Sequence, residues 1–147
     1  MTGRRVGATD GLNTKPAHEL IPLIRDGEIT AQALCESVFS AIAEQQSDIN
    51  AYITLDEETA IEQAADVDGR IARCEDVGPL AGIPVALKDL ICTKGLLTTC
   101  GSKILPDFIP PYDATVTIRL READAIIPGK LNMDEFAMGS SNENSAY

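Results

Sequence analysis

The chain contains no tryptophan and only one histidine, and its four cysteines include no CxxC pair. A zinc site needs several sulfur or nitrogen ligands at close spacing, so these residues are too few and too scattered for one. A Cys–His nucleophile would depend on His18, which lies in a polar N-terminal stretch, and is therefore disfavoured. We expect the cysteines to be reduced, mostly buried small residues.

Basic residues are also scarce, because 12 Lys and Arg stand against 23 Asp and Glu, for a net charge of −11. Proteins that grip a nucleic-acid backbone carry clustered positive charge, so we expect any nucleic-acid contact to fall on a partner. The sequence has no apolar run long enough to cross a membrane, and its first residues, MTGRRVGATDGLN, do not form a secretory signal. We therefore expect a cytoplasmic protein without membrane contact.

Residues 1–78 are expected to be mainly helical. An amphipathic helix over residues 20–24 should end at Gly27, and Thr30 is placed to cap a second helix. A third helix is expected after Asp56, which is another suitable capping residue. These helices carry no pattern that indicates chemistry, so we interpret them as packing elements.

Residues 79–147 change character and predict the start of an α/β core. The stretches IPVALKDLI (83–91) and AIIPGKL (125–131) are typical of strands, and a helix capped by Asp113 should lie between them. Strand, crossover helix and strand predict two parallel neighbours whose carboxyl ends meet at one edge. The inner face of the helix is expected to carry Val116, Leu120 and Ala123.

Lys88 ends the first of these strands, directly after the apolar run of residues 84–87. Ligands of open α/β sheets bind outside the carboxyl ends of strands, where Lys130 and the loop 133–147 also emerge. Two interpretations of Lys88 remain open on the pattern alone. It is either a lysine with a chemical role in a cleft or a surface lysine that reaches water or pairs with Asp89.

Two stretches, GPLAGIPVALKDLICTKGLLTTCGSKIL and PPYDATVTIRLREADAIIPGKLNMDEFAMGSSNENSAY, resemble the amidase signature family. The segment GKLNMDEFAMGSSNENSAY looks more like the glutamine-hydrolysing subunits of the aspartyl/glutamyl-tRNA amidotransferases than like the stand-alone amidases. The resemblance implies an amidase signature fold, an α/β fold in which N-terminal helices precede a central mixed sheet covered by helices. It also implies that residues 1–147 are the N-terminal part of a single, longer domain.

The family uses a Ser–cis-Ser–Lys triad, and Lys88 stands where its lysine stands. The resemblance therefore assigns Lys88 as the base, which in its neutral form takes the proton of the nucleophilic serine through the bridging serine. Both serines belong to a downstream motif that Ser140, Ser141 and Ser145 do not match, so the 147 residues alone are expected to be inactive. Gly139, Ser140 and Ser141 are expected to contribute to substrate binding.

The resemblance further implies a glutamine-hydrolysing subunit whose ammonia converts mischarged Glu-tRNA(Gln) or Asp-tRNA(Asn) to Gln-tRNA or Asn-tRNA. The companion B and C subunits would complete a heterotrimer, and the tRNA would be held through that complex. The complex would be a carbon–nitrogen ligase that uses ATP and Mg²⁺, mainly on the partner subunit. No cofactor and no metal are expected on this chain itself.

Two residues depart from the family pattern. Asp124 stands where a glycine is usual, at the expected C′ position of the helix, where a left-handed backbone disfavours most other residues. Replacing it by glycine is therefore expected to stabilise the fold by about 1 kcal/mol. Pro128 lies inside the second predicted strand, where it cannot donate a ladder hydrogen bond and should weaken the pairing.

Three other functions stay open at the level of sequence. The chain resembles part of a stand-alone amidase that hydrolyses a small amide, although the loop 132–147 favours the amidotransferase. It also fits a truncated, non-catalytic product that only binds a partner subunit through its helices. Finally, a desolvated Lys88 would suit a Schiff-base enzyme that acts on a carbonyl substrate.

Overall fold

The computed structural model describes residues 11–147 and contains four α-helices, three short strands and two 3-10 helices in that part of the chain. The helices are α1 (Ala17–Arg25), α2 (Ala31–Ile49), α3 (Glu57–Ala72) and α4 (Thr115–Glu122), with the 3-10 helices η1 (Leu12–Thr14) and η2 (Glu135–Ala137). The strands are β1 (Tyr52–Leu55), β2 (Leu87–Lys88) and β3 (Gly129–Leu131).

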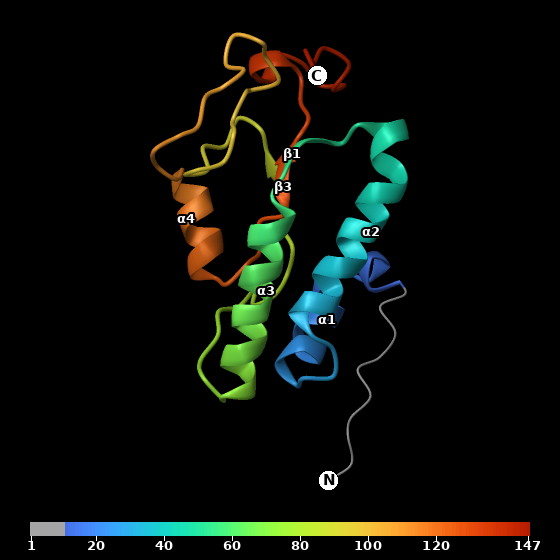
Figure 1. The fold of residues 1–147 in the computed structure, drawn as a ribbon, viewed down its shortest axis with the longest axis vertical. Coiled ribbons are helices and arrows are strands. Elements are labelled where there is room, and N and C mark those ends of the chain that lie inside the picture. The colour runs from blue at the N-terminus through green and yellow to red at the C-terminus, as the bar shows by residue number, and fades with distance from the viewer. Residues whose placement is uncertain (1–10) are drawn as a thin grey trace.

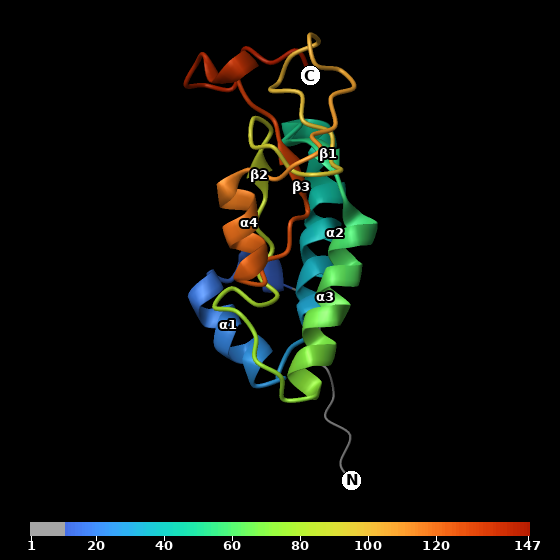
Figure 2. The ribbon, with the colours of Figure 1, turned by 90° about the vertical axis from the view of Figure 1, so that its left-hand side faces the viewer.

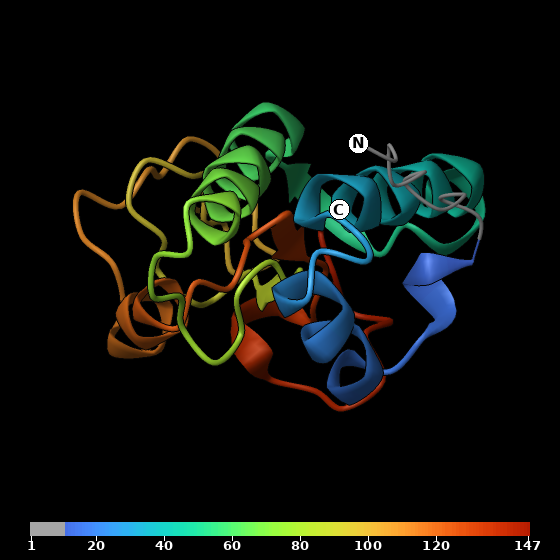
Figure 3. The same cartoon turned by 90° about the horizontal axis from the view of Figure 1, so that it is seen from below.

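The strands lie between two layers of helices. Helices α2 and α3 run side by side on one side of the sheet, and α1 and α4 lie on the other side (Figure 2 and Figure 3). The long connection between β2 and α4 and the C-terminal loop gather at one end of the molecule, beyond the strands (Figure 1). This arrangement brings the loops that follow β2 and β3 to the same end of the fold.

The predicted start of the second helix is confirmed in its capping contact. The Thr30 hydroxyl accepts a hydrogen bond from the Ala33 N–H at 3.0 Å, which satisfies one of the free donors of the first turn. Asp68 of α3 supplies a second cap, because its carboxylate accepts from the Ala31 N–H at 2.7 Å and the Gln32 N–H at 3.0 Å. This cap joins α3 to α2 through their polar atoms as well as their apolar faces.

The predicted third helix is also present, since α3 begins at Glu57 directly after Asp56. The Asp56 side chain makes no capping hydrogen bond, however, and its backbone N–H donates to the Pro128 carbonyl at 2.9 Å. The inner faces of α1, α2 and α3 meet in one apolar core. Its buried members from these helices include Leu20, Ile24, Leu34, Phe39, Ala60, Ala64 and Val67.

The sheet is mixed, as the fold class predicted, with the order β1-β3-β2. β2 and β3 pair in parallel through Leu87 with Lys130 and Lys88 with Leu131, which confirms the predicted neighbours. β1 pairs antiparallel with β3 and is a strand that the sequence patterns did not reveal. β2 is shorter than expected, because Pro84 and Pro128 remove donors between the ladder and an isolated bridge from Pro84 to Ile126.

The expected effect of Pro128 is seen as a shortened ladder, because β3 begins only one residue later, at Gly129. Pro128 is buried, and it serves the sheet only as an acceptor through its carbonyl. Gly129 has a steric role at this crossing, since a Cβ there would overlap the carbonyl oxygen of Thr54 in β1. The Pro-Gly pair therefore permits a close approach of β1 and β3 without leaving an unpaired donor.

The predicted cap of α4 was wrong. Ala114 occupies the N-cap position, and the Asp113 carboxylate instead accepts from the Lys94 N–H at 2.7 Å and pairs with Arg121 at 3.2 Å. The predicted inner face is also shifted, because Val116 is 44% exposed. The buried residue is Thr117, whose hydroxyl donates to the Cys92 carbonyl at 3.1 Å.

Asp124 has the predicted left-handed backbone, with φ of 60°, two residues after the end of α4. Its carboxylate has a use that the sequence did not indicate. It binds the Arg70 guanidinium through two hydrogen bonds of 2.7 and 3.0 Å, and it accepts from the Gly78 N–H at 2.5 Å. The predicted stabilisation by glycine at position 124 must therefore be revised, because that change would remove three hydrogen bonds.

Candidate functional site

Lys88 lies at the carboxyl end of β2, and its side chain is exposed, whereas Leu87 before it and Asp89 after it are buried. This alternation follows from the pleat of a strand, which turns successive side chains to opposite faces. The amine of Lys88 is therefore directed away from the core of the described residues. The open face at the carboxyl end of the sheet is where the sequence predicted a ligand site.

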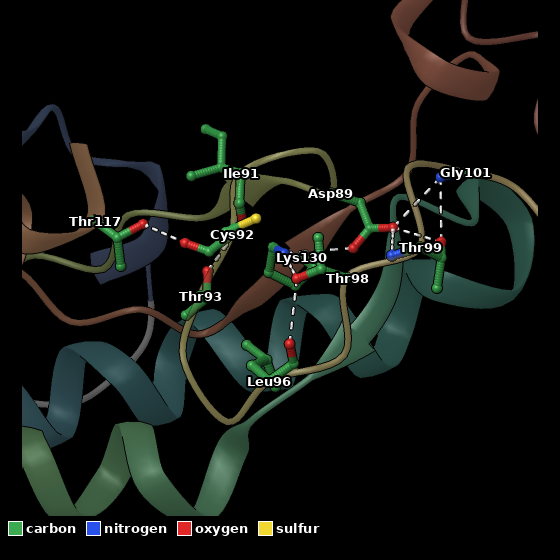
Figure 4. A network of polar contacts seen from close by, with 10 residues as sticks. All are labelled: Asp89, Ile91, Cys92, Thr93, Leu96, Thr98, Thr99, Gly101, Thr117 and Lys130. Carbon is green, nitrogen blue, oxygen red and sulfur yellow. Dashed lines mark hydrogen bonds and ion pairs between the residues drawn. The ribbon is translucent and has the colours of Figure 1, made fainter. Parts of the chain in front are cut away.

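The Asp89 carboxylate points the other way and is enclosed by the connection that follows β2 (Figure 4). Its Oδ2 accepts from the Thr99 N–H at 2.8 Å, from the Thr99 hydroxyl at 2.5 Å and from the Gly101 N–H at 3.4 Å. Its Oδ1 faces the ammonium of Lys130 at 3.5 Å. The surface pair between Lys88 and Asp89 that the sequence left open is thus not formed.

Lys130 is the buried lysine of this edge, with no exposed side-chain surface. Its Nζ donates to the Thr98 hydroxyl at 2.7 Å, and the Thr98 hydroxyl in turn donates to the Leu96 carbonyl at 3.2 Å (Figure 4). Burial lowers the pKa of Lys130, and the negative charge of Asp89 opposes that shift. The sequence placed Lys130 at the correct edge of the sheet but indicated no partner for it. The available signal was the presence of a charged residue inside the apolar run AIIPGKL, which predicts a buried charge that needs a partner.

The loop after β3 is organised around Asp134, whose side chain is buried under it. The carboxylate accepts from the N–H groups of Ser141 at 3.2 Å, Asn142 at 3.0 Å and Asn144 at 3.0 Å. These bonds, led by that from Asn144, lower the pKa of Asp134, and the positive charge of Lys88 adds to the effect. The carboxylate that holds the loop is therefore close enough to Lys88 to be affected by its charge.

The three predicted substrate-binding residues, Gly139, Ser140 and Ser141, lie exposed on this loop. A Cβ at Gly139 would overlap the Asp134 carboxylate, so any other residue here would force the loop or that side chain to shift. The loop is also tied to the connection after β2, because Ala146 N–H donates to the Gly101 carbonyl at 2.9 Å. The structure thus groups the predicted residues with Lys88 at one end of the sheet, and their role in binding stays a prediction.

Other candidate chemistry receives no support in residues 11–147. These residues contain no group of three His, Cys, Asp or Glu side chains that could hold a metal ion. All four cysteines are free, as expected, but only Cys35 is buried, and its burial raises the pKa of the thiol to about 12. His18 is exposed on α1, and no helix in this part of the chain is long and apolar enough to cross a membrane.

Residues 33–147 match the family model described as Amidase. The chain is 56% identical over 124 residues to the A-type subunit of the glutamyl-tRNA(Gln) amidotransferase of Natranaerobius thermophilus, a match that covers 84% of this chain and 25% of that protein. Among solved structures, it is similar to the native peptide amidase of Stenotrophomonas maltophilia, with a TM-score of 0.81 and 31% identity over 91% of this chain and 28% of that one. It is also similar to the corresponding glutamyl-tRNA(Gln) amidotransferase subunit of Thermotoga maritima, with a TM-score of 0.71 and 29% identity over 94% of this chain and 27% of that one. The chain therefore spans about a quarter of the length of these proteins.

Proposed function

The chain belongs to the amidase family, and we propose that it is part of the glutamine-hydrolysing subunit of a tRNA-dependent amidotransferase. The observation that carries this proposal is the position of Lys88 in a chain 56% identical to such a subunit. Lys88 is the exposed amine at the carboxyl end of β2, whereas the neighbouring Lys130 is buried and bound to Thr98 and Asp89. Of these two lysines, only Lys88 is open to a substrate from this edge.

Lys88 would act as the base of the Ser–cis-Ser–Lys triad, with serines that are not among these 147 residues. A serine hydroxyl is a weak nucleophile until a base removes its proton, and a free lysine has too high a pKa to do so at neutral pH. Enclosure of an amine away from water disfavours its ammonium form, and the further length that relatives possess would supply such an enclosure. The activated serine would attack the side-chain amide of glutamine, form an acyl-enzyme and release ammonia.

The remaining parts of the proposal concern substrate and partners. The loop that Asp134 holds would bind glutamine through Gly139, Ser140 and Ser141, which it presents to solvent at the same end of the sheet as Lys88. Companion subunits would receive the ammonia, bind the mischarged tRNA and use ATP and Mg²⁺ in the cytoplasm. The net charge of −11 supports this division, because a nucleic acid would be repelled by this chain.

A stand-alone amidase is the second candidate, because the TM-score of 0.81 to the peptide amidase exceeds the 0.71 to the amidotransferase subunit. The two functions differ in their dependence on partners. An amidotransferase subunit should transfer the nitrogen of glutamine to a mischarged tRNA only when its companion subunits are present. A stand-alone amidase should hydrolyse a small amide without them.

The test uses a chimera that joins residues 1–147 to the part of the Natranaerobius thermophilus protein that follows its matched region, purified with that organism's companion subunits. We expect Lys88→Ala to remove glutamine-dependent ammonia release and Lys88→Arg to fail as well, because a guanidinium stays protonated. The 147-residue chain alone is the control and should release no ammonia. Near-normal activity of Lys88→Arg would show that Lys88 is not the base.

A further inference from the structure

We propose that Asp89 and Lys130 form a positioning pair that holds the end of β2, so that the Lys88 amine stays on the open face of the sheet. This inference rests on the proposed function, because it assigns the pair a role through Lys88. Neither residue is proposed to contact glutamine. Both lie on the buried side of the strands, opposite to the Lys88 side chain.

The first support is the number of bonds that fix the residue next to Lys88. The Asp89 N–H donates to the Leu131 carbonyl of β3 at 3.1 Å, and the Asp89 carbonyl accepts from the Cys100 N–H at 3.3 Å. The backbone of Asp89 is thus bonded through both its N–H and its carbonyl, and its carboxylate is bonded to Thr99. A rotation of the chain at Asp89 would break all of these bonds, so the direction of the Lys88 side chain depends on them.

The second support is the burial of both charges, which neither apolar packing nor solubility requires. Desolvating two ions opposes folding, and a well-packed apolar pair of similar volume stabilises a core at least as well as a buried ion pair. Lys130 pairs in register with Leu87, one position before Lys88, so the ion pair lies directly beneath the strand end. A costly buried pair at this place is explained by a requirement for geometry at Lys88.

The third support is the effect that removing either member of the pair would have on the charge of the other. Asp89 accepts three hydrogen bonds from Thr99 and Gly101, so these donors would still hold its carboxylate in place without Lys130. Without Asp89, no negative charge from that carboxylate would oppose the effect of burial, which lowers the pKa of Lys130. The other titratable groups that face Lys130 are the Cys92 and Cys100 thiols, and burial raises the pKa of Cys100. The acid whose carboxylate feels the charge of Lys88 is Asp134, which is buried under the C-terminal loop.

These charges predict different effects for the two single variants in the chimera. Asp89→Asn should lower kcat for glutamine hydrolysis about 100-fold through misplacement of Lys88, with the KM for glutamine unchanged, and should leave the acid limb of the pH profile in place. Lys130→Met should leave an uncompensated carboxylate that favours the Lys88 ammonium. Its acid limb should move to higher pH, because an added net negative charge in the neighbouring residue favours a protonated amine.

Removing one partner of a buried pair can unfold a protein, so the double variant Asp89→Asn/Lys130→Met completes the test. It should fold, keep the acid limb of the parent chimera and retain the low kcat of Asp89→Asn. The matched control is Arg70→Met, which breaks the ion pair with Asp124 in the connection between α4 and β3. It should lower the melting temperature without changing kcat or the acid limb. Folding of every variant is checked by circular dichroism.

Two results would overturn the positioning role while the proposed function stands. One is a folded double variant with the kcat of the parent chimera, and the other is a folded Lys130→Met variant whose acid limb has not moved. Both results are interpreted in this way when the Lys88→Ala chimera is inactive, because that result supports the role of Lys88 as the base. If Lys88→Ala keeps its glutaminase activity, the proposed function fails, and the positioning role fails with it.

Discussion

Asp124→Gly is expected to destabilise the chain, although it relieves a left-handed residue. The relief is at most about 1 kcal/mol, because Asp tolerates this backbone better than most residues and glycine also loosens the unfolded chain. Against this stand the two bonds to Arg70 and the bond from the Gly78 N–H. The Arg70 and Asp124 side chains are 25% and 16% exposed, so solvent screens their attraction in part. The freed Gly78 N–H costs up to about 1 kcal/mol, which offsets the relief, so the loss of the two bonds to Arg70 should make the net change destabilising.

Urea unfolding of the 147-residue chain at neutral pH, followed by circular dichroism, measures this change. Asp124→Asn separates charge from backbone, since asparagine also adopts the left-handed conformation and keeps one acceptor. It should lie between the parent chain and Asp124→Gly in free energy of unfolding. Glu75→Gln is the matched neutralisation, because Glu75 pairs with Arg73 at an exposed site and should leave the urea midpoint unchanged.

The pH dependence gives an independent check of the same contact. The Arg70 guanidinium and the Gly78 N–H hold the pKa of Asp124 below its ordinary value. The stability that this residue contributes is therefore complete above its unfolded pKa of about 3.9 and disappears as the pH falls through the lower folded value. The parent chain and Asp124→Asn should converge in stability over that acidic range. An Asp124→Gly chain as stable as the parent at neutral pH would refute the reasoning.

Two further predictions use the loop and the thiols. Gly139→Ala should push the loop away from Asp134 and raise the KM for glutamine of the chimera roughly tenfold, more than it lowers kcat, and an unchanged KM would remove the loop from substrate binding. A thiol reagent at pH 8 should modify the exposed Cys74 rapidly, whereas Cys35, with a pKa of about 12, should react only after unfolding; equal rates for the two would contradict the burial of Cys35.

The elements that the sequence predicted are those with a local signature. The N-terminal helices and the strand–helix–strand unit are local patterns within the chain, and both are present, although of the predicted caps only that of Thr30 is formed. β1 escaped prediction because YITL is only four residues long and is placed directly between two helices. Asp113 was misassigned because a carboxylate before a helix is a capping signal. Its actual partners are Lys94 and Arg121, which the tertiary fold brings into contact with it.

Partner choice over long distances also explains what was missed at the candidate site. Lys88 could be predicted because it breaks an apolar run at the end of a strand. The partner of Asp124 is 54 residues away, and Lys130 bonds to Thr98 across 32 residues. Hydrophobic periodicity does not report such contacts, because it registers that a side chain is buried and not which polar group satisfies it.

The burial pattern of the four residues Leu87 to Leu90 indicates that hydrophobicity alone does not determine which side chains are buried at the end of β2. Hydrophobicity alone would turn Leu90 inward and Asp89 outward, but Leu90 is 41% exposed and Asp89 is completely buried. Because a buried carboxylate opposes folding unless it is bonded, the chain must provide Thr99, Gly101 and Lys130 to keep it there. The same pleat that buries Asp89 leaves Lys88 open. A strand end built for stability alone would have placed a leucine where Asp89 lies, so the buried acid is best explained by the lysine that it holds in place.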